Sequence, residues 1–472
     1  MLKKLATAGI AVTGLIATSS AFALAPNAID PQNPGANDLV MHWSGATAQR
    51  NTIDGLLSNL CVAGTRDSYE NDPGDPTHLV VTCTLDSNAN NPDVPVAIEN
   101  MDLYFSYFLN IGSYSGVTPV VDQQTLTQMA VFGNASCTEG LPNEWVCRND
   151  NVAVPGSQYD YVPKAGCSDV EPALFKGSNV PAGGTSPSAA GLSTTSVSSV
   201  YQVIFGVGVH CSVLDDSVYG DCTGWAGSPK PVAGAGIKDI SRQSIRSIYS
   251  DLKAYWEQVP EYGLQDNDGN GNPDVEDFYT SFSPATEIKI YRRVNGSGTN
   301  ACMQSYFNRQ ECDSSAIPFT TDATALIPGN VEHVGSSTTI VRDRLDVTPN
   351  AIAYGSMEKQ PGASYGTNWA MVKIDGVDGT IEANTATGAY DFYCEASCQY
   401  QTANVNPEQE ALISAIVTAA QDASALAGSQ GVLAVADFIN NVPDLQFDHA
   451  TNPVSWTTKN SSACKFPTQV YP

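Results

Sequence analysis

The chain is short of basic residues. Its 472 residues include 22 Lys and Arg against 49 Asp and Glu, which gives a formal net charge of −27. Charged residues make up 15% of the chain, whereas about a quarter is usual in soluble proteins. A surface with so few cations is poorly suited to the phosphate backbone of nucleic acid or to anionic lipid headgroups. We therefore expect no nucleic-acid partner and no docking on an anionic membrane.

Histidine and long apolar runs are also scarce. The chain has five histidines, and no two of them have the spacing of metal ligands on one helix. Beyond the N-terminal segment, no stretch approaches the length of a membrane-spanning helix. These absences argue against a multi-histidine metal centre and against membrane insertion of the mature chain.

The first 23 residues have the pattern of an export signal. Lys3 and Lys4 precede a mostly apolar stretch, and Ala21-Phe22-Ala23 matches an A-x-A cleavage site. We expect a signal peptide over residues 1–23, cleaved after Ala23, and a periplasmic or secreted mature protein. The alternative is an uncleaved anchor helix, which the serines and threonines of this segment disfavour. No cysteine stands at the cleavage site, so a lipid anchor is not indicated.

The cysteine count fits an oxidising compartment. Twelve cysteines follow the export signal, and an even number in this context predicts disulfides. A thiolate metal site is the alternative, but the chain has no C-x-x-C pair. Pairing by proximity predicts five local bonds and one long-range bond: Cys61–Cys83, Cys137–Cys147, Cys211–Cys222, Cys302–Cys312, Cys394–Cys398 and Cys167–Cys464.

Strand-like and helix-like segments alternate along the chain. Apolar runs at 39–43, 200–209 and 287–291 predict strands, and helical spacing follows at 47–60 and 237–256. We expect an α/β fold. Three further segments are predicted to be irregular: surface insertions at 62–98 and 130–165, and a flexible Gly/Ser/Thr/Pro connector at 177–199. An Ala-rich helical segment interrupted near Gly428 is predicted at 409–439.

Three glycine turns are suited to bind an anion. Residues 44–47, 112–113 and 296–299 each offer backbone N–H groups and hydroxyls where a strand ends or a helix opens. Arg293 precedes the third turn, and its planar guanidinium suits a tetrahedral oxyanion. Asp169 can only accept hydrogen bonds when ionised, so it would favour an anion that still holds a proton. The alternatives are structural turns, and for Asp169 a cap on a helix starting near Val170.

The order of these segments resembles the periplasmic phosphate-binding proteins that feed phosphate ABC importers. Gly166-Cys167-Ser168-Asp169 is similar to their GASD segment, and Arg293 with Gly296-Ser297-Gly298-Thr299 matches their RxxGSGT signature. The sequence departs from the family at Ala48-Gln49, where Phe-Pro is usual, and at Asn295, where an acidic residue often buttresses the arginine.

The resemblance implies a fold, a ligand and a set of contacts. The fold would be a two-lobed type 2 periplasmic-binding-protein-like α/β fold with a cleft between the lobes: residues 24–200 and 392–472 in lobe I, and 201–391 in lobe II. Inorganic phosphate, or a related tetrahedral oxyanion, would be captured there and passed to an ABC permease. Hydroxyls of Thr47, Ser113, Ser297 and Thr299, the N–H of Gly298, the guanidinium of Arg293 and the carboxylate of Asp169 would bind it.

One other functional class is open. A secreted structural or matrix protein that retains the fold is the main alternative, favoured by the disulfides, the insertions and the missing lipid anchor. An enzyme is not expected. Gly362-Ala363-Ser364-Tyr365-Gly366 spells G-x-S-x-G, but no buried strand precedes it.

A calcium loop is predicted independently of the anion site. Residues 266–277 fit the twelve-residue pattern, with Gly271 at the turn and oxygen ligands at the expected spacing. The alternative is a solvated acidic loop. The predicted ligands are Asp266, Asp268, Asn270, Asn272 through its backbone carbonyl, Asp274 and Asp277.

Overall fold

The computed structural model describes residues 29–470, except 73–76, 111, 216–217, 220–221, 223–235, 263–285, 314–316, 320–325, 328, 335–336, 359, 362–365 and 437–446. The predicted signal peptide, the predicted calcium loop and most of the G-x-S-x-G segment lie outside the described residues. Within the described part, no helix combines the length and the apolar character needed to cross a membrane.

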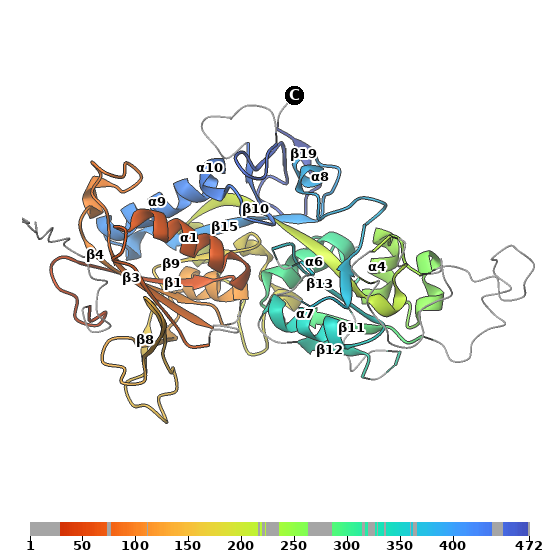
Figure 1. Ribbon diagram of the computed structural model, residues 1–472, viewed down its shortest axis with the longest axis horizontal. Helices are drawn as coiled ribbons and strands as arrows, with labels where there is room; N and C mark the ends of the chain where they lie inside the picture. The colour runs from red at the N-terminus through yellow and green to blue at the C-terminus, as the bar shows by residue number, and fades with distance from the viewer. Residues whose placement is uncertain are drawn as a thin grey trace, which may run out of the picture.

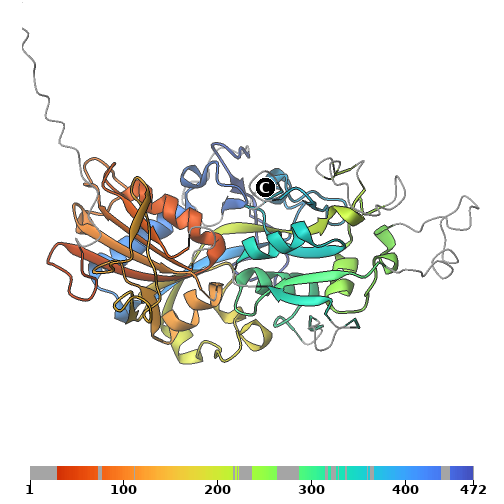
Figure 2. The ribbon, with the colours of Figure 1, turned by 60° about the horizontal axis from the view of Figure 1, so that its bottom comes forward.

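The fold is α/β, as predicted, and is built on one large mixed sheet. The elements of residues 38–168 and those of residues 289–371 gather at opposite ends of the molecule (Figures 1 and 2). The strands of the first half in the main sheet are β1 (Asp38–Gly45), β2 (Asp67–Glu70), β3 (His78–Thr84), β4 (Asp102–Phe108), β6 (Thr138–Leu141), β7 (Glu144–Val146) and β9 (Ala165–Ser168); β5 (Leu126–Met129) and β8 (Gln158–Tyr161) form a separate two-stranded sheet. Those of the second half are β11 (Lys289–Arg293), β12 (Val331–Val334), β13 (Ala351–Ser356) and β14 (Trp369–Met371).

The apolar run at 39–43 forms a central strand. β1 lies parallel to β4 on one side and to β9 on the other. Leu39, Met41 and Trp43 are buried in the main core. Strands covered on both faces need such near-continuous apolar runs, which explains why this segment is recognisable in the sequence.

Helices cover the sheet. In the first half, α1 (Arg50–Leu60) lies beside α9 (Pro407–Gln421), which returns from the C-terminal part of the chain (Figure 1). The remaining helices are α2 (Thr118–Val121), α3 (Ala189–Thr194), α4 (Arg242–Tyr249), α6 (Gly298–Asn308), α7 (Thr338–Val347), α8 (Glu382–Ala386) and α10 (Ala423–Leu426).

Two long strands join the halves. β10 (Thr195–His210) pairs with β15 (Tyr393–Gln401) through its first part and with β13 through Phe205–Val209. The prediction of a flexible connector up to residue 199 is therefore wrong, because α3 and the first part of β10 occupy its end. Pairing with β15 orders this polar tract, and Gln401 Nε2 donates to Gly191 O and Thr195 Oγ1.

Three other local predictions need correction. The helix expected over 237–256 is confined to α4, which Ser241 caps, and Leu252 is exposed. The helical segment expected to continue to 439 ends earlier, and Val432–Val435 forms strand β16, which pairs with β10. The expected insertions at 62–98 and 130–165 contain β2 and β3, and β6 and β7, all of which belong to the main sheet. Short buried apolar runs do not distinguish helix from strand by periodicity alone.

Six disulfides are present, three of them as predicted. The bonds Cys61–Cys83, Cys137–Cys147 and Cys211–Cys222 are confirmed. The other three predicted pairs are wrong, since the bonds are Cys167–Cys398, Cys302–Cys394 and Cys312–Cys464. Cys394 and Cys398 both lie on β15, and four residues of extended strand separate their Cα atoms by about 13 Å, too far for a disulfide.

Candidate functional site

Close backbone packing positions the first half of the site. Gly45 at the end of β1, Gly116 at the end of η3 (Gly112–Gly116) and Gly166 in β9 lie against one another. A Cβ on Gly116 would lie 2.8 Å from the Cα of Gly45, and one on Gly166 would lie 2.7 Å from the Cα of Gly116. Side chains of any size are excluded there. The η3 turn and the end of β9 therefore meet, bringing Ser113 and Asp169 together.

The second half of the site is the junction between β11 and α6. β11 ends at Arg293, Gly296 turns the chain with φ of 93°, and Ser297 caps α6 by accepting a hydrogen bond from Asn300 N. Tyr114 N donates to Gly296 O at 2.9 Å, so the η3 turn contacts this junction directly. The N-terminal N–H groups of α6, with the positive end of the helix dipole, thus face the first half.

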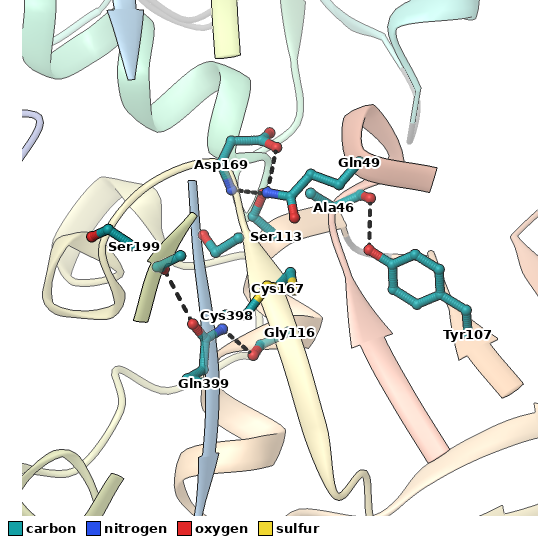
Figure 3. The surroundings of a disulfide bond; sticks show 12 residues. Ala46, Gln49, Tyr107, Ser113, Gly116, Cys167, Asp169, Ser199, Cys398 and Gln399 are labelled. Carbon is teal, nitrogen blue, oxygen red and sulfur yellow. Dashed lines mark hydrogen bonds between the residues drawn. A yellow bond between two sulfur atoms is a disulfide. The ribbon is translucent and has the colours of Figure 1, made fainter. Parts of the chain in front are cut away.

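Predicted residues from both halves meet at Gly298. A Cβ on Gly298 would lie 2.8 Å from the Cβ of Asp169 and 2.9 Å from its Oδ2, and it would overlap Ser113 Oγ. Asp169 N donates to Ser113 Oγ at 3.2 Å (Figure 3). The structure therefore brings Ser113, Asp169 and Gly298 together, although they are far apart in the sequence.

The charges of the site are buried. Arg293 and Asp169 are 1% and 2% exposed. Arg293 Nη1 donates to Thr338 Oγ1 at 2.9 Å, at the N-terminus of α7. Burial raises the pKa of Asp169 to about 6, and the Arg293 guanidinium and the hydrogen bonds with Ser113 and Gln49 oppose this rise. A buried cation and two helix N-termini thus lie close to the Asp169 carboxylate and add positive potential there.

The remaining predicted hydroxyls differ in their placement. Ser297 and Thr299 are buried at the start of α6. The Ser297 hydroxyl accepts from Asn300 N, which leaves its proton for a ligand. The hydroxyl of Thr299 lies beside the Asp169 carboxylate and helps to lower the pKa of that group. Thr47 is only half-buried in η1 (Thr47–Gln49), and within the described residues no recorded contact joins its side chain to this group.

Sequence reasoning missed Gln49. This side chain is fully buried, and its Nε2 donates to Asp169 Oδ1 at 3.3 Å (Figure 3). The only signal was that Ala48-Gln49 replaces the Phe-Pro usual in the family that the sequence resembles. A departure from a familiar pattern thus marked a residue of the site.

The arrangement suits one kind of ligand. Hydroxyl, backbone N–H and guanidinium donors converge from two halves of the molecule on a place that also holds a carboxylate acceptor. Such a set binds a small tetrahedral oxyanion that retains a proton. Because these side chains are buried, a ligand held among them would be shielded from solvent. Charged hydrogen bonds are stronger in such an interior than in water.

Comparison with solved structures gives similarities of fold. A putative phosphate ABC transporter substrate-binding protein from Clostridium perfringens, with bound phosphate, is 13% identical with a TM-score of 0.41, covering 80% of this chain and 93% of that one. An ABC-type phosphate transport receptor from Vibrio cholerae is 12% identical with a TM-score of 0.38, at the same coverage of both chains. A high-affinity periplasmic phosphate-binding protein is 11% identical with a TM-score of 0.42, covering 88% and 91%. No family model and no curated protein matches the sequence.

Proposed function

We propose that this protein captures inorganic phosphate, or a related tetrahedral oxyanion, outside the cytoplasm. The observation that carries the proposal is the meeting of buried Arg293 and Asp169 with Ser113 at the N-terminus of α6. The net charge of −27 does not oppose capture, because the field inside an enclosed site is set by the nearest charges and dipoles.

The Asp169 carboxylate favours phosphate over sulfate as the ligand. At neutral pH the carboxylate is mainly ionised, since its pKa lies at about 6. An ionised carboxylate repels an oxyanion unless a ligand proton lies between them. Phosphate carries such a proton at neutral pH and sulfate does not. The site is therefore expected to discriminate between two anions of nearly equal size.

The proposal also includes export, delivery of the ligand and a structural calcium ion. Export by the segment 1–23, delivery of the ligand to an ABC permease, and a structural calcium ion at residues 266–277 are inferred from the sequence. Calcium is tested separately by melting the protein with calcium or with EDTA: an unchanged melting temperature would contradict its structural role.

The direct test is calorimetric titration of the mature, phosphate-stripped protein with phosphate, with sulfate as the competitor. Tight phosphate binding that sulfate does not displace is the expected result. Binding of neither anion would overturn the proposal and favour a secreted structural protein, the alternative that the sequence left open.

Arg293→Ala is expected to remove most of the phosphate affinity, by a factor of about a hundred or more, because it deletes the buried charge-assisted donor. The matched control is Arg148→Ala, which removes an exposed arginine that pairs with Asp150. Equal affinity of the Arg293 variant and the control would contradict the role of Arg293.

A further inference from the structure

Gln49 holds a buried carbonyl oxygen beside the carboxylate of Asp169. The side chain is 0% exposed, and its Nε2 donates to Asp169 Oδ1 (Figure 3). This fixes the orientation of the amide, because an ionised carboxylate can only accept. Oε1 is buried as well and has no hydrogen-bond partner among the residues that the structure describes. A buried, unpaired carbonyl is unfavourable unless something else satisfies it.

A ligand proton would satisfy this oxygen. The other polar groups of the site are set up to donate. Arg293 and the N–H groups at the start of α6 can only donate, and the hydroxyls of Ser113 and Ser297 already accept from Asp169 N and Asn300 N, which leaves their protons for a ligand. The acceptors are the Asp169 carboxylate and Gln49 Oε1. Hydrogen phosphate carries one proton and can pair with one acceptor, whereas dihydrogen phosphate carries two and can pair with both.

We propose that Gln49 is a specificity-determining residue of the anion site: it accepts a second ligand proton and so selects dihydrogen phosphate, or the equivalent form of a related oxyanion, over the hydrogen form. The inference rests on the proposed function and deepens it. Asp169 would distinguish phosphate from sulfate, and Gln49 would distinguish between the two protonation states of phosphate.

The surrounding charges leave a pH window in which this can be measured. Arg293 faces the carboxylate from β11 and stays charged. Burial, with the nearby Asp169 charge, raises the pKa of the Tyr107 and Tyr201 phenols far above neutrality, so they stay uncharged. Arg50, next to Gln49, forms an ion pair with a glutamate of β2. With the pKa of Asp169 at about 6, the main titration between pH 6.5 and 8.5 is that of phosphate itself.

The experiment is a pH series of phosphate dissociation constants between pH 6.5 and 8.5, by calorimetry, for the full mature protein and three variants. Gln49→Met keeps the side-chain volume and removes both polar atoms. Gln49→Glu keeps an acceptor oxygen. The matched control is Gln128→Met in β5 (Leu126–Met129), a fully buried glutamine of the separate two-stranded β5–β8 sheet.

We expect wild-type affinity to fall by about tenfold per pH unit once phosphate loses its second proton, because only the dihydrogen form fits. The control should keep this slope. Gln49→Met should lose it and bind the hydrogen form as well. Gln49→Glu should steepen it, since two adjacent carboxylates demand an additional proton.

The outcomes separate the two proposals. If the wild-type protein binds no phosphate at any pH, the proposed function fails. If it binds with a pH-independent affinity, the function stands and the role of Gln49 is overturned. The role of Gln49 is also overturned if Gln49→Met keeps the wild-type pH slope of phosphate affinity. The same holds if Gln49→Glu keeps that slope, and this second variant decides the test even where Gln49→Met does not fold.

Discussion

At the scale of single residues, Asp169 is held in a state that costs the folded protein stability. Its carboxyl is buried, and desolvation raises its pKa from 3.8 to about 6. The folded state therefore binds this proton more tightly than the unfolded state. The stabilisation from protonated Asp169 is fully present below pH 3.8 and is lost as the pH rises through 6. A residue retained at such a cost is typical of a functional site.

Asp169→Asn is therefore expected to stabilise the ligand-free protein at neutral pH. Its gain over wild type should grow by about 2 kcal/mol between pH 4.5 and 7.5, because the amide avoids the cost of ionisation. Chemical denaturation with the disulfides intact measures this difference. The same substitution at exposed Asp93 controls for the loss of one charge. A gain for Asp169→Asn that does not depend on pH would show that Asp169 is not buried as an ionised group.

The sequence allowed part of the site to be predicted at this scale. Ser113, Asp169 and Gly298 meet as expected: Ser113 and Gly298 stand at glycine turns whose geometry is local, and Asp169 directly follows strand β9. The resemblance implied a ligand contact for Thr47 and gave no role to Gln49. Which of these side chains turns inward depends on the short helix η1, which the sequence alone does not specify. Only the packed structure shows that the side chain of Gln49 reaches Asp169.

At the scale of elements, the junction where glycines of β1, η3 and β9 pack together leaves no room for a larger side chain. The neighbours of Gly116 are backbone atoms, including the carbonyl oxygen of Cys167, so they cannot rotate out of the way of a new side chain. Gln399 Nε2 also donates to Gly116 O and holds the turn against β15 (Figure 3). The disulfide between Cys167 and Cys398 fixes β9 to the same strand.

Gly116→Ala should therefore destabilise the protein by about 1–3 kcal/mol, the range of an overpacked interior, and should weaken phosphate binding by displacing Ser113. Gly55→Ala is the matched control. Gly55 lies within α1 with no atom within 4 Å of an added Cβ, so alanine there should stabilise by about 0.5–1 kcal/mol. Thermal and chemical denaturation measure the change in stability of both variants. A Gly116 variant as stable as the Gly55 variant would contradict the tight junction.

Element predictions succeeded where one local pattern decides the structure, and failed where pairing decides it. β1 and the α6 N-terminus were recognisable from an apolar run and a Gly-Ser turn. The polar tract before residue 200 forms part of β10 because β15 supplies its hydrogen bonds. Val432–Val435 is a strand because β10 and β17 (Val454–Ser455) lie on either side of it. Both outcomes depend on residues distant in the sequence.

At the scale of the whole molecule, the C-terminal segment 459–464 ties the two halves together. Ser461 N donates to Glu395 in β15, and Ala463 N donates to Glu171, two residues beyond Asp169. Cys464 is bonded to Cys312 in the loop after α6. The same segment therefore holds the element that carries Asp169 and the element that carries the α6 end of the site.

A second contact reinforces this tie. Glu311, in the loop after α6, accepts hydrogen bonds from the N–H and the hydroxyl of Ser178, at 3.1 and 3.2 Å. Gly177 leaves room for the Glu311 carboxylate, since a Cβ there would overlap it. The candidate site residues are buried, so under the proposed function ligand exchange would require the halves to separate, and both contacts resist that motion.

Removing the Cys312–Cys464 bond should therefore speed the opening of the site. The double variant Cys312→Ser/Cys464→Ser is expected to raise amide hydrogen exchange at residues 112–116 and 296–299 by about tenfold, equivalent to about 1.4 kcal/mol of opening free energy. Phosphate release should accelerate similarly. The control is Cys137→Ser/Cys147→Ser, which removes a disulfide between the residue before β6 and the residue after β7. Because hydrogen exchange needs no ligand, this test is independent of the proposed function. Equal exchange in both double variants would show that the C-terminal segment does not restrain the site.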